Sequence, residues 1–146
     1  MNEALDLNRD ECVRMLRACV AGRVALTTPT GPHIVPVNYT IIDDATVLRT
    51  TPYSILGTYG RGTMLAFEID HFDVEHRHGW SVVARGHAQL VDDAAELEEI
   101  NRVWPARPWA RGQRNLVLRI PWAEVSGRRL GDDWDPWAEA PLKRHA

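Results

Sequence analysis

The stretch VALTTPTGPHIVPVNYTII, residues 24–42, decides the fold class of this chain. On both sides of Pro29-Thr30-Gly31-Pro32 it is rich in β-branched residues, and those four residues have the composition of a tight turn. The stretch therefore predicts a β-hairpin. Residues 43–45 turn the chain again into a strand over residues 46–50, which makes a meander of three strands. Because Pro36 has no N–H, we expect it at a bulge or at an unpaired edge of its strand.

Helical patterns lie before and after these strands. Asn8 is followed three residues later by Glu11, and Asp93 is followed in the same way by Glu96. This is the spacing of a capping box, in which two side chains satisfy free N–H groups at the start of a helix. An apolar stripe of helical period follows each pair. We therefore expect an N-terminal helix within residues 1–22 and another helix after Asp93.

The rest of the chain is rich in strand patterns. Alternating or β-branched runs predict strands over residues 64–70, 79–91, 115–120 and 124–129, with a polar loop at 71–78 and a bulge or close approach at Gly86. Residues 131–146 have no period and are expected as an irregular tail, in which Trp134 and Trp137 suit a lid or a subunit contact. We expect residues 1–146 to form a single, mainly β domain, an antiparallel barrel or sandwich with peripheral helices.

Composition excludes several functions. The net charge is −3 and Lys143 is the single lysine among 17 basic residues, so there is no dense basic face for nucleic acid or an anionic membrane. No apolar run is long enough to cross a bilayer, and the first residues lack a secretory pattern, so we expect a cytoplasmic protein. Cys12 and Cys19 lie too far apart in the expected helix for a disulfide and should be buried. The histidines and acids of residues 71–78 have no fixed direction, and we expect no metal site.

The segment from Leu48 to Ser54 combines an arginine with several hydroxyls. Arg49 ends a strand, and a short helix is expected to follow, with Thr51 as its cap and Pro52 in its first turn. Helix N–H groups, hydroxyls and a guanidinium within one turn are the groups that hold a phosphate. The alternative is an ordinary capped helix with Arg49 on the surface.

The sequence also resembles a known family over about residues 5–130. The resemblance depends on the order and spacing of several short motifs rather than on one of them. They are Glu11-Cys12, Gly22-Arg23-Val24-Ala25, Val35-Pro36-Val37-Asn38-Tyr39, Arg49-Thr50 with Pro52 and Ser54, Ala66-Phe67-Glu68-Ile69-Asp70, Gly79-Trp80-Ser81-Val82-Val83 with Gly86, Pro108-Trp109-Ala110 with Arg114, and Arg119-Ile120 before Gly127-Arg128-Arg129. In this set the chain resembles the pyridoxamine 5′-phosphate oxidase-like flavoproteins of the FMN-binding split-barrel superfamily, and in particular their short actinobacterial members.

The resemblance implies a six-stranded antiparallel split β-barrel that forms a homodimer and binds FMN between its subunits. By position, Arg49 and Ser54 would contact the phosphate, and Thr50 and the Trp80-Ser81 segment would line the isoalloxazine ring. Relatives usually have a lysine at the position of Ile55, and its loss removes a charge partner of the phosphate. The whole expected cofactor-binding set is Asn38, Arg49, Thr50, Thr51, Ser54, Trp80, Ser81, Trp109 and Arg114, the last two from the second subunit.

These features lead to one main hypothesis and two alternatives. The main hypothesis is an FMN-dependent oxidoreductase acting on an unidentified small molecule, in which the flavin carries the electron chemistry and no catalytic side chain is named. One alternative is a non-enzymatic split barrel that binds flavin, haem or another anionic ligand, and it is motivated by Ile55. The other is a reductase that uses a deazaflavin.

Overall fold

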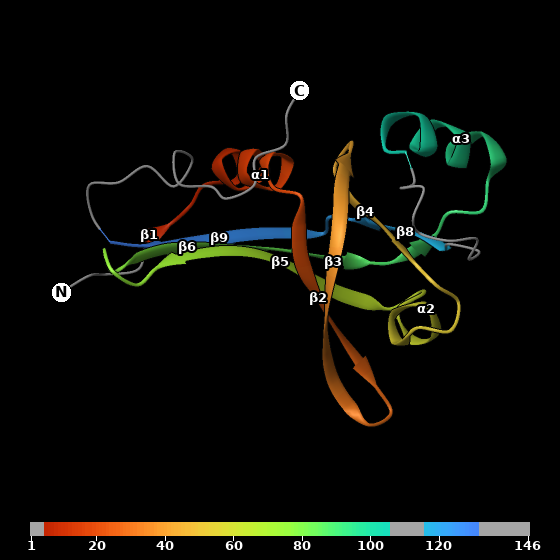
Figure 1. Ribbon diagram of the computed structural model, residues 1–146, viewed down its shortest axis with the longest axis horizontal. Coiled ribbons are helices and arrows are strands. Elements are labelled where there is room, and N and C mark those ends of the chain that lie inside the picture. Colours follow the sequence, from red (N-terminus) through yellow and green to blue (C-terminus); the bar gives the residue numbers. More distant parts are fainter. Residues whose placement is uncertain (1–4, 106–115, 132–146) are drawn as a thin grey trace.

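A computed structural model describes residues 5–105 and 116–131 of the chain (Figure 1). These residues form nine strands and three helices. In chain order the elements are β1 (Leu5–Asp6), α1 (Arg9–Ala18), β2 (Ala21–Thr28), β3 (Gly31–Ile42), β4 (Ala45–Thr50), α2 (Ile55–Tyr59), β5 (Met64–Asp73), β6 (His78–His87), β7 (Gln89–Leu90), α3 (Ala94–Val103), β8 (Leu116–Pro121) and β9 (Glu124–Leu130).

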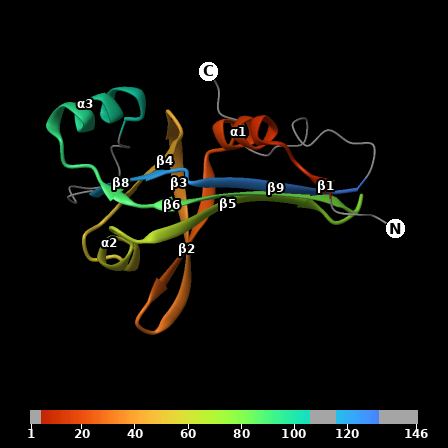
Figure 2. The same ribbon diagram turned by 180° about the vertical axis from the view of Figure 1, so that it is seen from behind.

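The strands form one antiparallel sheet in the order β1-β9-β6-β5-β2-β3-β4-β8-β7. Figures 1 and 2 show that the sheet is curled: β5, β6 and β9 run along the molecule, whereas β2 and β3 cross it steeply. Helices α1 and α3 are drawn above the strands and α2 below them, near the start of β5. Because the sheet is curled, α1 and α2 pack on one face of it, where Leu16 and Leu56 join the same apolar core, whereas α3 packs on the opposite face of β4. The predicted mainly β fold with peripheral helices is confirmed.

The described residues form nine strands rather than the six that the resemblance implies. Seven of the nine correspond to the strands that the sequence patterns predict. The additional strands, β1 and β7, have two residues each and are too short to show an alternation. The expected strand 79–91 is interrupted because the backbone of Ala88 bonds to Gly62 and Thr63 before β5, which ends β6 at His87 and directs β7 toward β8. The expected loop 71–78 is shorter, since β5 continues to Asp73 and β6 begins at His78.

The hairpin of β2 and β3 is confirmed, and Pro36 lies on an open edge of β3. The register of the hairpin is uninterrupted from Thr28 opposite Gly31 to Ala21 opposite Asn38, while β4 pairs with β3 only from Tyr39 onward. The Tyr39 N–H bonds to the Val20 carbonyl, 3.1 Å away, so odd-numbered residues of β3 direct their N–H toward β2 and even-numbered ones away from it. Pro36 therefore removes an N–H from the open edge, which makes this edge a poorer partner for a foreign strand.

Helices α1 and α3 begin as the capping-box spacings predict. The Asn8 side chain accepts a hydrogen bond from the Glu11 N–H at 2.8 Å and donates one to the Glu11 carboxylate at 2.8 Å. The Asp93 carboxylate accepts from the Glu96 N–H at 2.9 Å. Helix α1 ends at Ala18, before the expected end at Gly22, because β2 already begins at Ala21.

The start of α2 differs from the prediction. Its N-cap is Ser54, whose hydroxyl accepts the Gly57 N–H at 2.9 Å, whereas Thr51 and Pro52 precede the helix. The physical reason is a turn in which the Thr51 carbonyl accepts both the Ser54 N–H and the Ser54 hydroxyl, at 3.3 and 2.9 Å. The prediction that Thr51 caps this helix is therefore wrong.

Two groups of apolar side chains pack on the sheet. The larger one lies between the sheet and α1 and includes Leu16, Phe67 and Trp80, while the smaller one lies under α3 and includes Val47 and Ile100. Cys12 and Cys19 are buried free thiols, as expected. Burial raises the pKa of the Cys12 thiol to about 11.

Gly86 is a point of close approach, as predicted. A Cβ atom at this position would lie 1.8 Å from the backbone oxygen of Pro121. The corner between β8 and β9 therefore packs directly on the backbone of β6.

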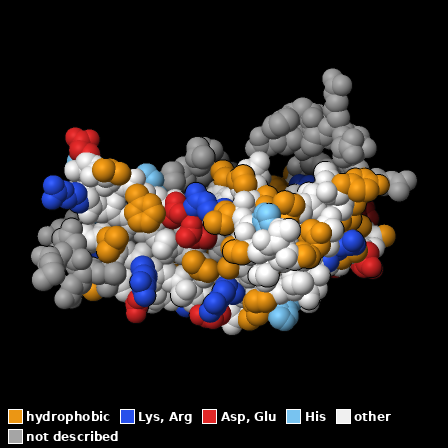
Figure 3. All heavy atoms as spheres, turned by 90° about the horizontal axis from the view of Figure 1, so that it is seen from below, with side chains coloured by type: hydrophobic (Ala, Val, Ile, Leu, Met, Phe, Trp, Pro, Cys, Tyr) orange, Lys and Arg blue, Asp and Glu red, His pale blue; other side chains and the backbone are white. Residues whose placement is uncertain are grey.

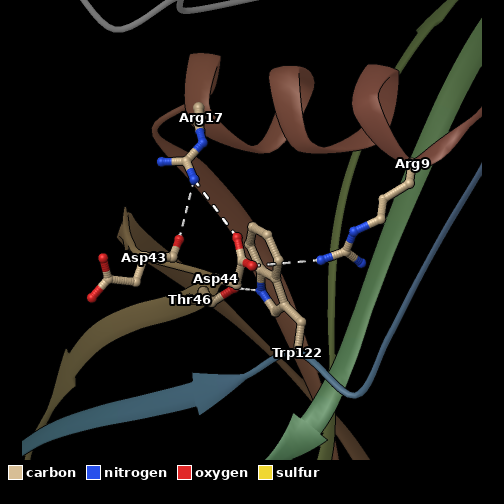
Figure 4. Close-up of polar contacts among 6 residues, drawn as sticks. All are labelled: Arg9, Arg17, Asp43, Asp44, Thr46 and Trp122. Carbon is tan, nitrogen blue, oxygen red and sulfur yellow. Dashed lines mark hydrogen bonds and ion pairs between the residues drawn. The ribbon is translucent and has the colours of Figure 1, made fainter.

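Polar contacts join α1 to the turn between β3 and β4 (Figure 4). Arg17 donates to the Asp43 carbonyl at 3.2 Å, and the guanidiniums of Arg9 and Arg17 both approach the Asp44 carboxylate to 3.8 Å. Below them, the Trp122 indole donates to the Thr46 hydroxyl at 2.9 Å. The three charged side chains are at least half exposed, so these pairs orient α1 and contribute little stability.

Candidate functional site

Hydroxyl groups gather where β4 ends and α2 begins. The hydroxyls of Thr50 and Ser54 lie 2.6 Å apart, and Ser54 caps the helix through the Gly57 N–H. Thr51 belongs to the same turn through its carbonyl. The structure therefore brings together three of the residues that the sequence predicts for the cofactor site, Thr50, Thr51 and Ser54.

Arg49 points away from this group of hydroxyls. Successive side chains of a strand alternate between the faces of a sheet, so Arg49 shares a face with Val47 under α3, whereas Thr50 shares the other face with Leu48. The Arg49 guanidinium donates through Nη2 to the Asn101 side-chain oxygen at 3.0 Å and to the Trp104 carbonyl. It also stacks over the Trp104 ring, 4.1 Å from its centre. Arg49 and the hydroxyls thus flank the same strand end from opposite faces.

The charge of Arg49 has no acidic partner among the described residues. Its hydrogen bonds go to an amide oxygen and a backbone carbonyl, both neutral, and Nε and Nη1 make no hydrogen bond to the described part of the chain. By contrast, Arg23, Arg85, Arg102 and Arg119 each contact a carboxylate. Arg49 is half-buried, and this burial lowers its pKa. A half-buried cation with free donors and no counter-charge is suited to an anion.

The side chains around α2 include no lysine. Ile55 is 41% exposed at the first position of the helix, where its aliphatic group offers no charge to an anion. Arg61, just after the helix, is exposed and donates through Nε to the Gly57 carbonyl at 3.0 Å. Arg61 therefore lies against α2, whereas the Arg49 guanidinium lies on the other face of β4, next to α3.

The other expected contacts are not part of this group. The Trp80 side chain points into the core and is 1% exposed, whereas its neighbour Ser81 is half-buried on the opposite face of β6. Of these two, Ser81 is the side chain that a ligand can reach in the structure as described. Asn38 is exposed on β3 opposite Ala21. Trp109 and Arg114 lie outside the described residues.

Ser81 belongs to the open face of the sheet, which is the part of the face opposite α1 that β2, β5, β6 and β9 form. Across these strands Arg23, Glu68, Val83 and Ser126 form one row, and Ser81 and Arg128 lie in the next row. A groove of about 640 Å³ crosses β5, β6 and β9 here. In Figure 3, which shows the molecule from this side, acidic and basic side chains lie next to each other among hydrophobic and uncharged ones.

An ion cluster occupies the middle of the open face. The Arg23 guanidinium contacts the carboxylates of both Glu68, at 2.7 Å, and Asp70. Burial, together with a hydrogen bond to Asp70, raises the pKa of Glu68, although Arg23 partly opposes the change. Glu68 and Asp70 are two residues apart in β5, so the sequence alone predicts that both acids lie on one face of the strand. The sequence does not predict their contact with Arg23, which lies 45 residues before Glu68.

Sequence reasoning missed Asn101 and Trp104 as neighbours of Arg49. They follow it by 52 and 55 residues and lie at the end of a helix that the sequence predicts only as a peripheral element. No local signal could have joined them to Arg49. In residues 5–105 and 116–131 there is no group of three or more metal-binding side chains, and no helix is long and apolar enough to cross a membrane.

Comparison with known proteins assigns the family. The sequence model of the family described as pyridoxamine 5′-phosphate oxidase matches residues 8–129. The chain belongs to this family. The uncharacterised protein Rv0080 of Mycobacterium tuberculosis is 32% identical to the chain over 136 residues, which cover 90% of this chain and 88% of that protein.

Solved structures of similar proteins share the fold. The FAD-binding protein of Mycobacterium smegmatis is 28% identical with a TM-score of 0.72, and the match covers 89% of this chain and 98% of that one. A conserved protein of unknown function from Corynebacterium diphtheriae is 26% identical with a TM-score of 0.75, covering 88% of this chain and 98% of that one. The expected assignment to the pyridoxamine 5′-phosphate oxidase-like split barrels is thereby confirmed.

Proposed function

We propose that this family member is a flavin-dependent oxidoreductase that binds FMN between two copies of the chain and acts on a small molecule. The proposal combines the family assignment, a similar structure named as an FAD-binding protein, and the geometry around Arg49. Haem and deazaflavin remain alternatives from the sequence, and no feature of the described residues favours either over a flavin.

One observation carries the proposal. The Arg49 guanidinium is half-buried and bonded to neutral acceptors alone, and two of its nitrogens remain available. Removing a cation from water without a counter-charge costs free energy, and a phosphate would offset that cost through charge-assisted hydrogen bonds. The residues present therefore fit a phosphorylated cofactor at the end of β4, with the hydroxyls of Thr50 and Ser54 on the other side of the strand.

The two flavins differ in the phosphate that they present. FMN ends in a phosphate monoester that carries nearly two negative charges, whereas FAD contains a pyrophosphate in which each phosphate carries one. Ile55, in place of the lysine usual in relatives, lowers the positive charge near the phosphate. FMN is our primary expectation, and FAD is the alternative that the relative from Mycobacterium smegmatis supports.

The open face of the sheet is the surface on which we expect the second copy to pack. No described helix covers this part of the sheet, so it is free to pack against a second copy (Figures 1 and 2). Small and uncharged residues such as Ala66, Ser81 and Ser126 would allow close contact. Val83→Asp should therefore shift the protein from dimer to monomer in light scattering, whereas Arg102→Gln on exposed α3 should not.

The chemistry comes from the cofactor rather than from a side chain. A bound flavin supplies hydride or electron transfer to and from the substrate. The chain's own residues would bind and orient it: Arg49 through its free nitrogens, Thr50 and Ser54 through hydroxyls, and Ser81 from the open face. We assign no proton-transferring side chain.

The test is to identify the ligand and measure its affinity. The protein as purified should show flavin absorbance, and mass spectrometry of the released ligand should identify FMN or FAD. After removal of bound ligand, fluorescence titration with FMN, FAD and riboflavin should give the tightest binding with a phosphorylated flavin. Turnover with a nicotinamide donor and an acceptor would establish the enzyme, whereas flavin binding without turnover would favour the non-enzymatic alternative. A colourless protein that binds no flavin at micromolar concentrations would refute the proposal.

A further inference from the structure

The end of α3 holds Arg49 in an unusual way. Arg49 Nη2 donates both to the Asn101 side-chain oxygen, 3.0 Å away, and to the Trp104 carbonyl, and the Trp104 ring lies 4.1 Å from the guanidinium carbon. These contacts engage Nη2 and one face of the guanidinium plane. The N–H groups of Nε and Nη1 make no hydrogen bond to the described residues.

Each group that contacts the Arg49 guanidinium is uncharged. The α3 helix itself carries acidic residues, but Glu96 pairs with Arg119 and Glu99 pairs with Arg102. Asn101, one turn after Glu98, presents an amide to Arg49 where an aspartate of nearly the same shape would present a charge. A carboxylate at this position would neutralise the guanidinium and compete with any external anion.

We propose that Asn101 and Trp104 are positioning residues for Arg49: they hold its guanidinium through neutral contacts and so keep its charge and its unengaged N–H groups available to the cofactor phosphate. This inference rests on the proposed flavin site. Asn101 then affects anion binding without touching the anion, because it acts by holding Arg49. Burial, which lowers the pKa of Arg49, makes the absence of a counter-charge here more consequential than on the surface.

The test compares FMN with riboflavin, which has the same ring and ribityl chain but no phosphate. Asn101→Asp should weaken FMN binding by about tenfold or more, because the new carboxylate pairs with Arg49, and should change riboflavin binding less than about twofold. Arg102→Gln is the matched control: it makes the same change in the charge of α3 at the next residue, which bonds to Glu99 and not to Arg49. It should leave both affinities within about twofold.

A second pair of variants tests the stacking contact. Trp104→Phe keeps an aromatic face and should retain FMN affinity within about twofold, whereas Trp104→Leu should weaken FMN binding by about threefold to tenfold. In an Arg49→Ala background, Asn101→Asp should have no further effect on FMN affinity, because the pairing partner is absent. A merely structural role of Asn101 would lower riboflavin and FMN binding together and would persist in that background.

The outcomes separate the inference from the proposed function. If the wild-type chain binds neither FMN nor riboflavin, the flavin site and the inference fall together. If the wild type binds FMN but Asn101→Asp and Arg102→Gln act alike, or if riboflavin loses as much affinity as FMN, the flavin site stands and the positioning role is refuted.

Discussion

Replacement of Arg49 by alanine removes the half-buried cation on which the proposed phosphate site depends. Its unengaged nitrogens are Nη1, with two N–H groups, and Nε, with one, and a phosphate can accept charge-assisted hydrogen bonds from either of them. Such bonds contribute roughly 1.5–3 kcal/mol each, and part of that is recovered when the phosphate is hydrated instead. We expect a net loss of about 2–4 kcal/mol in FMN binding, or about 30-fold to 1000-fold in Kd. Arg49→Lys keeps the charge but not the planar fork and should fall between alanine and the wild type.

The same variant should also loosen α3. Arg49→Ala removes two hydrogen bonds to neutral acceptors and the contact with the Trp104 ring, together worth about 1–3 kcal/mol before the regained hydration is subtracted. For a chain of this size that corresponds to a fall in Tm of roughly 3–8 °C, with the fold retained. Thermal unfolding followed by circular dichroism measures this effect separately from the flavin titration.

The assay is fluorescence titration of the ligand-free protein with FMN, and riboflavin serves as the control that lacks a phosphate. Riboflavin affinity should change much less than FMN affinity. If Arg49→Ala binds FMN as the wild type does while Arg61→Ala abolishes binding, the phosphate lies at the other end of α2. If neither substitution changes the affinity, the site holds no phosphate and the reasoning is refuted.

Four further results are expected. Ile55→Lys should tighten FMN binding without tightening riboflavin binding in the same titration, since it adds a positive charge that can pair with the proposed phosphate; weaker FMN binding would show that the side chain does not turn toward the phosphate. Gly86→Ala should lower the free energy of unfolding in urea by about 3 kcal/mol, because its Cβ would lie 1.8 Å from the Pro121 oxygen; an unchanged value would mean that β6 and the β8–β9 corner are further apart. Cys12, with a pKa of about 11, should react with a thiol reagent at pH 8 only after denaturation, and rapid labelling of the native protein would contradict its burial. The pKa of Glu68 is raised in the folded state, so between the ordinary glutamate pKa and the raised one the folded state binds more protons than the unfolded state. The free energy of unfolding should therefore fall as pH rises through that window. Glu68→Gln should remove this pH dependence in urea unfolding, and a pH dependence that persists would belong to another group.

The sequence by itself determined the local elements of this protein. The capping pairs at Asn8 and Asp93, the turn within residues 24–42 and the period-two strands each depend on interactions between residues close in the chain, and all are present in the structure. The family could likewise be assigned from short motifs in order. Even the burial of Cys12 and the close approach at Gly86 followed from local pattern.

Tertiary structure decided what each site residue faces. The sequence joined Arg49 to Thr50 and Ser54 because they are neighbours in the chain, but strand alternation sends Arg49 toward α3 and Thr50 toward the cap of α2. Trp80 and Ser81 are separated in the same way, one into the core and one onto the open face. Asn101 and Trp104 reach Arg49 only because α3 folds back over β4. Pairing across more than 50 residues depends on the packing of whole elements, and no local pattern in a single sequence encodes it.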